Sequence, residues 1–277
     1  MGSEYVLSRV DGLPLRPSGA WAKEKLYYVE RYMRIFSQGM KNLWGARVFV
    51  DLLAGPGRCI DDENGDEFDG SPLLAINCAE PFSRIVLIEQ APELCDALRQ
   101  RAGRKACVIP GDCNNPDVIQ KVRAEFTPKT LGLAFVDNLG LDVPLVTLAQ
   151  LTEAVRIDLV ITFQIGDLTR NLENVLDGWE SEDRWTAFFG SANWLDVVNG
   201  GRARNESPSE IATRLMNFYG DRLGAIGYPH ITHSHQFMRN SRNVALYRLL
   251  LASKHQRAVE FFQKIAQIEP GGQRRLF

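Results

Sequence analysis

Apolar residues follow two alternating patterns between residues 21 and 163. Short runs rich in β-branched residues, such as RVFVDLL at 47–53 and IDLVITF at 157–163, are almost continuously apolar, which is typical of strands buried on both faces of a sheet. Between them, apolar positions recur every three or four residues, the spacing of an amphipathic helix. This alternation predicts βαβ units and a mostly parallel sheet with right-handed crossovers.

The pattern places individual elements along this part of the chain. Ser71-Pro72 and Asn115-Pro116 each combine an N-cap residue with a proline at the first helical position, so they predict helix starts. We expect strands at 47–53, 84–89, 107–110, 131–137 and 157–163. We expect an N-terminal helical segment over 21–46, with its helix at 21–40, and further helices at 71–78, 92–103, 116–125 and 145–154.

The remaining segments depart from this alternation. Residues 1–20 carry glycine and proline without periodicity and are predicted to form an arm, and the acidic stretch 59–70 is predicted to be a loop. Residues 172–225 are predicted to be a helical insertion whose polar part, NGGRARNESPS at 199–209, is mobile. Residues 230–253 are expected to add two strands, followed by a helix at 256–268. The predicted fold class is α/β: one Rossmann-like domain over 1–277, with a mostly parallel seven-stranded sheet.

Composition excludes several classes of protein. The net charge of −2 over 277 residues argues against a strongly basic, non-specific nucleic-acid binder. The five cysteines are an odd number without CxxC spacing, which indicates reduced thiols and no zinc site. No apolar run reaches the roughly 18–20 residues of a membrane-spanning helix. We therefore expect a cytoplasmic protein that has no structural metal and does not contact a membrane.

Polar residues and glycines follow the predicted strands, where open parallel sheets bind ligands. Glu89 suits a ribose, because a carboxylate accepts hydrogen bonds from both hydroxyls of a vicinal diol, and Asp112 could accept from the exocyclic amine of adenine. The predicted cofactor-binding residues are Asp51, Ala54, Gly55, Pro56, Gly57, Glu89, Gln90, Asp112 and Cys113.

The glycine turn distinguishes between nucleotide-like cofactors. Its spacing is not GxGxxG, and the next helix starts only at Ser71, after an acidic stretch. Dinucleotide enzymes place a pyrophosphate on a helix that starts directly after the turn, and the acidic residues here would repel it. A sulfonium with an amino-acid tail meets no such repulsion. The sequence therefore favours S-adenosyl-L-methionine (SAM) over NAD.

The motifs DLLAGPGR at 51–58 and DLTRN at 167–171, together with GSPLLA, IVLIE and LGLAFVDNLGLDV, resemble the three-Cys-motif partner (TcmP) family over about residues 20–265. The resemblance implies a class I SAM-dependent methyltransferase fold, SAM as cofactor and a three-Cys-motif protein as partner. Members of the family usually carry Asp-Pro-aromatic-Gly after the fourth strand, where this chain has Asp137-Asn138-Leu139-Gly140. We expect Asp137 and Asn138 to be catalytic, although the stacking ring that would hold a flipped base is missing.

Several polar groups allow two interpretations. Asp167, Arg170 and Asn171 are predicted to bind substrate, although Asp167 could simply cap a helix at 171–176. The basic residues of the first helix and of the link could track phosphates or be solvated; they are Lys23, Lys25, Arg31, Arg34, Lys41, Arg202 and Arg204. His230, His233 and His235 fit an edge-strand face better than a metal site. The acidic stretch could close over the cofactor as a lid.

Together these residues predict a SAM-dependent methyltransferase acting on an amine of a nucleic acid or nucleotide, by direct in-line transfer. One alternative is a catalytically reduced methyltransferase-like domain that acts as a binding partner for another protein. Another is a nucleoside- or phosphate-processing enzyme that uses the same cleft.

Overall fold

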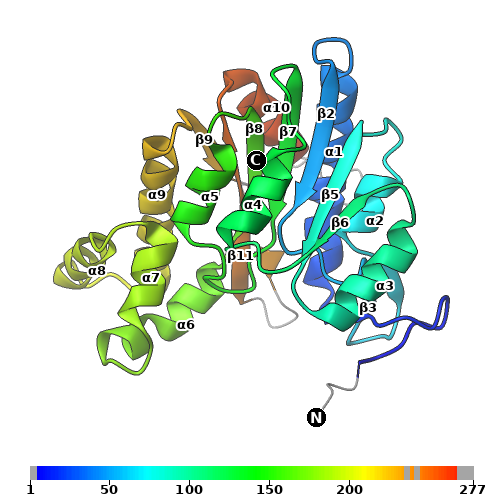
Figure 1. The fold of residues 1–277 in the computed structure, drawn as a ribbon. Helices are drawn as coiled ribbons and strands as arrows, with labels where there is room; N and C mark the ends of the chain where they lie inside the picture. Colours follow the sequence, from blue (N-terminus) through cyan, green and yellow to red (C-terminus); the bar gives the residue numbers. More distant parts are fainter. Residues whose placement is uncertain (1–4, 234–237, 240–243, 267–277) are drawn as a thin grey trace.

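The central sheet contains the five predicted parallel strands in the order β6-β5-β2-β7-β8 (Figure 1). The computed structural model describes residues 5–233, 238–239 and 244–266. The parallel strands are β2 (Ala46–Asp51), β5 (Arg84–Glu89), β6 (Cys107–Pro110), β7 (Thr130–Val136) and β8 (Ile157–Phe163). Antiparallel β11 (Ala245–Ser253) lies next to β8. The predicted α/β fold with a mostly parallel sheet is confirmed.

The far edge of the sheet differs in detail from the prediction. Two strands, β9 (His230–His233) and β10 (Met238–Arg239), pair with different parts of β11. Among the residues that the structure describes, the sheet therefore contains eight strands instead of the predicted seven. Residues 234–237 and 240–243 of the predicted final strands, and residues 267–268 of the predicted final helix, lie outside the described residues.

Helices cover both faces of the sheet because alternate residues of each strand point to opposite sides. Phe49 packs with α1 (Trp21–Met40), α2 (Ser71–Ile76), α3 (Pro92–Ala102) and α10 (Gln256–Ala266). Its neighbours Val48 and Val50 pack on the other face, with α4 (Pro116–Arg123), α5 (Leu145–Thr152) and the helices that follow β8. Among the described residues, no helix combines the length and apolar character needed to cross a bilayer.

The strand order reverses between β2 and β7. From β2 the chain moves outward to β5 and β6, then returns to the other side of β2 for β7 and β8. In open α/β sheets, ligands bind outside the carboxyl ends of the strands at such a reversal. Asp51 ends β2 and Asp137 directly follows β7, so the fold places these two carboxylates on either side of the expected ligand position.

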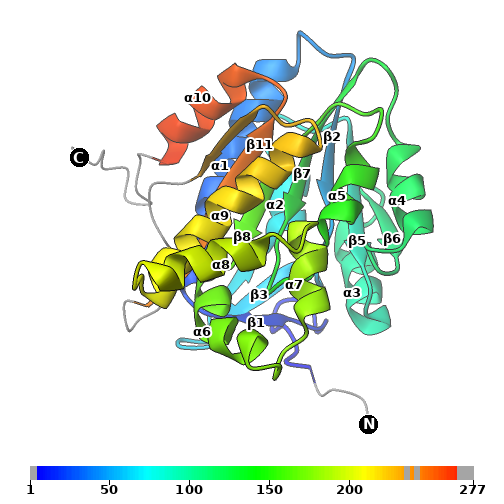
Figure 2. The ribbon, with the colours of Figure 1, turned by 90° about the vertical axis from the view of Figure 1, so that its left-hand side faces the viewer.

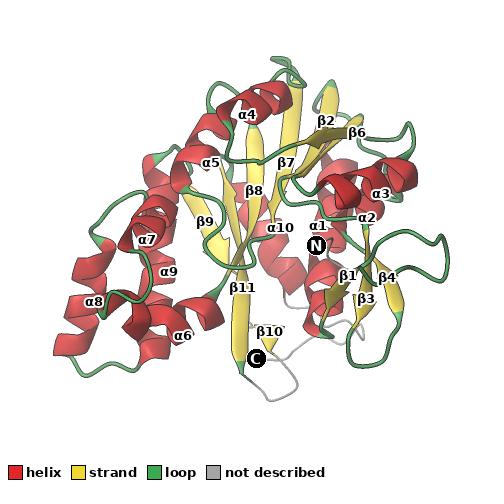
Figure 3. Cartoon of the chain, turned by 60° about the horizontal axis from the view of Figure 1, so that its bottom comes forward, coloured by secondary structure: helices red, strands yellow, loops and turns green. Residues whose placement is uncertain are grey.

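The acidic stretch is not a loop, and the described part of the N-terminal arm is not without structure. β3 (Arg58–Asp61) and β4 (Glu67–Asp69) form an antiparallel hairpin, and β1 (Arg16–Ser18) adds parallel to β3. The small sheet lies beside α1 and α2 (Figure 3). The Ser8 hydroxyl donates to Glu67 Oε2 at 2.6 Å. These strands of three or four residues are too short to show a hydrophobic period.

The polar link at 199–209 is mostly helical, since residues 199–203 belong to α8 (Trp194–Ala203) and residues 208–209 to α9 (Pro208–Ala225). The insertion comprises α7 (Glu182–Phe189), α8 and α9, after α6 (Ile165–Leu176) (Figure 2). Gly201 belongs to α8, where a Cβ would come within 2.6 Å of Ile211 Cγ1. Glycine therefore allows close packing of α8 against α9 here. Buried aromatic rings fill the insertion, and those of Phe188 and Tyr219 stack with centroids 4.7 Å apart.

The start of α9 gives a test of this ordered link. Ser207 and Glu210 form a reciprocal capping box, so we expect Ser207→Ala to lower the free energy of unfolding by about 0.5–2 kcal/mol. Ser209→Ala serves as the matched control, because Ser209 is the second residue of α9 and takes no part in the capping box. Urea unfolding curves of both variants make the comparison, and equal stabilities would contradict an ordered cap at Ser207.

Candidate functional site

The glycine turn after β2 packs directly against the end of β5. Gly55 and Gly57 have φ values of +64° and +90°, a region that side-chain-bearing residues rarely adopt. The Ala54 amide donates to the carbonyl of Ile88 at 2.9 Å. The turn thus holds its buried main chain against the carboxyl end of β5, and glycine at both positions leaves no side chain between it and a ligand.

Glu89 is fixed by two main-chain donors at the end of β5. Its Oε2 accepts from the Gly55 amide at 2.8 Å, and its Oε1 accepts from the Ala91 amide at 2.7 Å. Each carboxylate oxygen has a second lone pair for another donor. The side chain is therefore held in one position while it still has acceptor capacity for ligand hydroxyls.

A cavity of about 410 Å³, termed here the large cavity, opens between the turn and the ends of β5, β6 and β7. Its lining brings together many of the predicted cofactor-binding residues. Asp112 is fixed by accepting a hydrogen bond from the Asn114 amide at 2.8 Å. Burial raises the pKa of Cys113 to about 12, so the thiol presents an uncharged surface. The predicted residues that line this cavity are Gly55, Glu89, Gln90, Asp112, Cys113 and Asp137.

A second cavity of about 140 Å³, termed the small cavity, lies between α1, β1 and the glycine turn. It shares Arg16, Asp137 and Leu139 with the large cavity. The predicted residues Ala54, Pro56 and Gly57 line it from the turn. The two cavities therefore meet at Asp137 and together follow the carboxyl edge of the sheet.

Asp137 forms a buried ion pair with Lys25. Lys25 Nζ lies 2.6 Å from both carboxylate oxygens, and the Thr162 hydroxyl donates to Oδ1 at 2.9 Å. Burial opposes ionisation, yet the Lys25 ammonium and the Arg16 guanidinium hold the pKa of Asp137 below its usual value. Lys25 is thus neither solvated nor part of a surface that tracks phosphates. This pair could not be predicted from the sequence, because 112 positions separate its members.

Asp51 lies beneath the cavities instead of lining them. Its side chain is fully buried, with Oδ1 accepting from the Leu53 amide at 3.3 Å. The Oδ2 atom has no hydrogen-bond partner among the described residues. Burial raises the pKa of Asp51 to about 7, against a hydrogen bond from the Ser71 side chain that lowers it. Ser71 lines the small cavity and so connects Asp51 to it.

Asn138 supports the main chain of the following turn. The side chain is fully buried; its Oδ1 accepts from the Val143 amide at 3.2 Å, and its Nδ2 donates to the carbonyl of Thr162. This engagement favours a positioning function over the catalytic one expected from the sequence. Leu139, 68% exposed, lies on the rim shared by both cavities, where the resembled family carries an aromatic ring.

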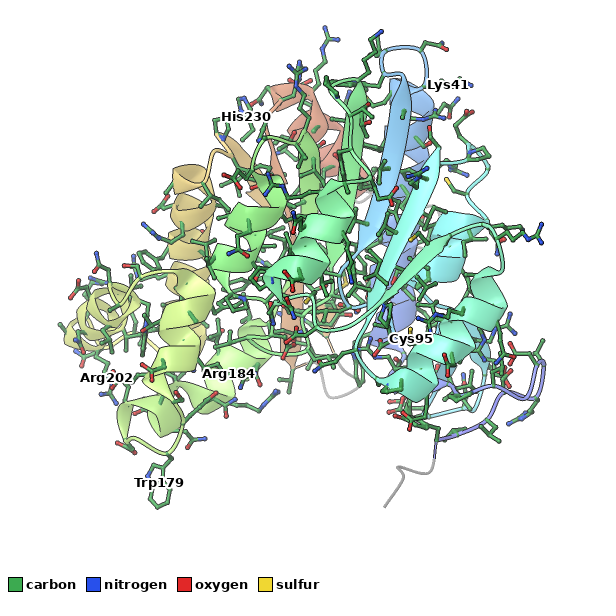
Figure 4. All side chains as sticks on the ribbon, viewed as in Figure 1. Lys41, Cys95, Trp179, Arg184, Arg202 and His230 are labelled. Atoms are coloured by element: carbon green, nitrogen blue, oxygen red, sulfur yellow. The ribbon has the colours of Figure 1, made fainter. Side chains whose placement is uncertain are left out.

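The predicted substrate-binding group lies in α6, beside the cavities. Because α6 begins at Ile165, Asp167 falls in its first turn and does not cap a helix at 171–176. Asp167 Oδ1 accepts from Arg170 Nη2 at 3.3 Å and from Asn171 Nδ2 at 3.1 Å. None of the three lines either cavity. Arg184 of α7 lies near this group, with its guanidinium 3.7 Å from the Asp142 carboxylate. Trp179, between α6 and α7, projects away from the body of the protein (Figure 4).

Most of the remaining basic residues are paired. Lys23 bonds to Asp61 at 2.8 Å, so the acidic hairpin is tied to α1. The other pairs join Arg31 to Tyr27, Lys41 to Glu80, Arg202 to Glu173 and Arg204 to Glu206. These contacts favour the interpretation of the basic residues as surface charges over a phosphate-tracking surface.

His230 and His233 lie on β9, whereas His235 falls outside the described residues. Within the described ranges, no group of three or more His, Cys, Asp or Glu residues lies close enough to hold a metal ion.

A third cavity, of about 390 Å³, opens at the opposite edge of the sheet, where β7 and β8 begin. Apolar side chains of α1 and α10, including Phe36 and Phe261, form most of its wall. None of the predicted site residues lines it.

Comparison with known proteins gives a likeness of fold. Protein LPL1258 of Legionella pneumophila superposes with a TM-score of 0.51 at 11% identity, over 89% of this chain and 91% of that one. An O-methyltransferase from Bacillus cereus, solved in complex with S-adenosylhomocysteine (SAH), superposes with a TM-score of 0.44 at 11% identity, over 81% of this chain and 80% of that one. No protein-family model and no curated protein matches the sequence. The strand order and the superposition on LPL1258 confirm the predicted Rossmann-like fold.

Proposed function

We propose that this chain is a SAM-dependent methyltransferase. The observation that carries the proposal is Glu89, fixed by the Gly55 amide on the wall of the large cavity, with Asp112 on the same wall. Two fixed carboxylates suit the ribose diol and the adenine amine of an adenosine. The cavity volume falls within the roughly 300–1,000 Å³ of small-molecule sites.

The residues present also fit the rest of the cofactor. The small cavity adjoins the large one at Arg16, Asp137 and Leu139, so the proposed tail would lie in it beside the adenosine. The Lys23–Asp61 pair and the β3–β4 hairpin stand where a dinucleotide enzyme starts its phosphate-binding helix. When bound, SAM supplies an electrophilic methyl group on a sulfonium. The chain itself would hold the acceptor in line and exclude water.

The proposed acceptor is an amine of a nucleic acid or nucleotide. Asp137 stands where the two cavities meet, and an acceptor N–H there would replace Lys25 as its donor. Leu139 offers an exposed aliphatic surface at the rim. Arg170 is largely exposed on the adjoining helix and would contact more distant parts of the acceptor.

A second candidate is a catalytically reduced binding protein, with a three-Cys-motif protein as partner, as the resemblance to the TcmP family implies. The observation that favours it is the Lys25–Asp137 pair, which occupies the carboxylate expected to orient the acceptor. Retention of Glu89 and Asp112 on a formed cavity favours the methyltransferase.

Calorimetric titration with SAM, S-adenosylhomocysteine (SAH), NAD and ATP tests the cofactor. We expect SAM and SAH to bind, and Glu89→Gln to weaken both by about 10–100-fold, because it removes the charge from hydrogen bonds to the ribose. Glu93→Gln, an exposed carboxylate in the next helix, is the matched control. Tighter binding of ATP or NAD than of SAM and SAH would overturn the proposal.

A further inference from the structure

Arg16 is placed at the centre of the site by an element that the sequence did not predict. The backbone of Arg16 in β1 pairs with that of Cys59 in β3. Its side chain lines both cavities. A Cβ added to Gly55 would lie 3.6 Å from Arg16 Nη1. The guanidinium therefore lies against the glycine turn, where the large and the small cavity adjoin.

The arm that carries Arg16 is firmly attached to the domain. Arg101 binds the Asp11 carboxylate and donates to the carbonyls of Leu13, Pro14 and Pro56. Its hydrogen bond to Pro56 ties the arm to the glycine turn itself. The position of the Arg16 backbone relative to the turn is thus fixed by main-chain pairing on one side and by Arg101 on the other.

The Arg16 guanidinium has no hydrogen bond or ion pair to any other residue in the described part of the chain, although it is half-buried. Its five N–H donors form a planar fork that matches a carboxylate in a bidentate manner. Neighbouring Asp137 is already bonded to Lys25 and Thr162. The guanidinium lies near Asp137 without a hydrogen bond to it, so its N–H donors are available to an anionic group of a ligand.

The small cavity has the size and lining for a short polar chain. At about 140 Å³ it is too small for a nucleoside but sufficient for an amino-acid tail. Its polar lining includes Arg16, Ser18, Lys25, Ser71 and Asp137, so it offers both cationic and anionic or hydroxyl partners. Such a mixture suits a zwitterion and does not suit an apolar or a singly charged group.

We infer that the small cavity is an α-amino-acid subsite and that Arg16 binds the carboxylate of the cofactor's amino-acid tail. The inference rests on the proposed SAM site and extends it to the N-terminal arm. The arm then gives the site its selectivity for SAM and SAH over adenosines that lack the tail.

Ligand truncation combined with mutation tests the assignment. The dissociation constants of SAH and of 5′-methylthioadenosine, which lacks the amino-acid tail, are measured for the wild type, Arg16→Gln and Arg16→Lys. We expect Arg16→Gln to weaken SAH by about 10–100-fold, and 5′-methylthioadenosine by less than about twofold, because only SAH contacts the guanidinium. Arg16→Lys restores part of the loss, since a lysine keeps the charge without the fork.

The outcomes separate this inference from the proposed function. Arg9→Gln, on the exposed part of the same arm, controls for general effects of removing an arginine. Equal weakening of both ligands by Arg16→Gln would show a merely structural role, and no weakening of SAH would exclude the clamp; either result overturns the inference while the SAM site stands. Absence of binding of both ligands to the wild type overturns both.

Discussion

Lys25→Met is expected to lower the free energy of unfolding by about 3–5 kcal/mol, the usual result of removing one partner from a buried ion pair. Both side chains are about nine-tenths buried, so Asp137 would remain as an unpaired charge in a low-dielectric environment. Methionine keeps the length and apolar stem of lysine. The loss therefore reports the charge and not a cavity.

Urea unfolding of three variants measures this effect. Lys25→Met combined with Asp137→Asn leaves no unpaired charge, so the double variant is expected to be more stable than Lys25→Met alone. Arg99→Met removes one member of an exposed ion pair, Arg99–Asp96, and is expected to cost under about 1 kcal/mol. If Lys25→Met cost no more than Arg99→Met, the pair would not be buried as described.

Unlike Lys25→Met, Asp51→Asn is expected to stabilise the protein near neutral pH, raising the free energy of unfolding by a few kcal/mol. Burial raises the pKa of Asp51 to about 7 in the folded chain, against about 3.9 when unfolded. The folded state then binds the proton more tightly, so the free energy of unfolding falls as pH rises from about 4 to about 7. Below this window both states are protonated, and above it both are ionised.

The stability difference between Asp51→Asn and the wild type, measured by urea unfolding across pH 3–9, tests this expectation. It should grow between about pH 4 and 7 and then stay constant. The charged groups that act on Asp51 are Asp137, which raises its pKa, and Arg16, which lowers it. Both are present in the two proteins, so their own titration cancels to a first approximation. A difference that is independent of pH would contradict a protonated, buried Asp51.

The sequence allowed the main sheet to be predicted because each strand and helix is long enough to show its own period. Runs such as 157–163 are apolar on both faces, and the structure buries every residue of β8. The glycine turn and Glu89 were predictable for a related reason. Parallel strands bring their carboxyl ends to one edge, so residues that follow different strands meet there without any knowledge of contacts.

The partners of the site residues could not be predicted, because they come from elements without a local signal. Lys25 belongs to an amphipathic helix on which a lysine normally faces water, and it is buried because α1 docks on the sheet beside Asp137 and Tyr247. Arg16 lies in a strand of three residues. Glycines at 200 and 201 suggested a loop, whereas close packing on α9 favours a small residue within a helix.

The position of α1 constrains how the chain folds during its synthesis. The helix is made before every strand of the main sheet, yet the Tyr247 hydroxyl donates to the carbonyl of Trp21, 226 residues away. The helix also packs on α10 and β10, near the end of the chain. Contacts this distant in sequence form late, since loop closure precedes them. On the ribosome, α1 can dock on α2 and β7 early, but the part of its apolar face that packs on β10 and α10 stays uncovered until those elements are made, and it is open to chaperones until then.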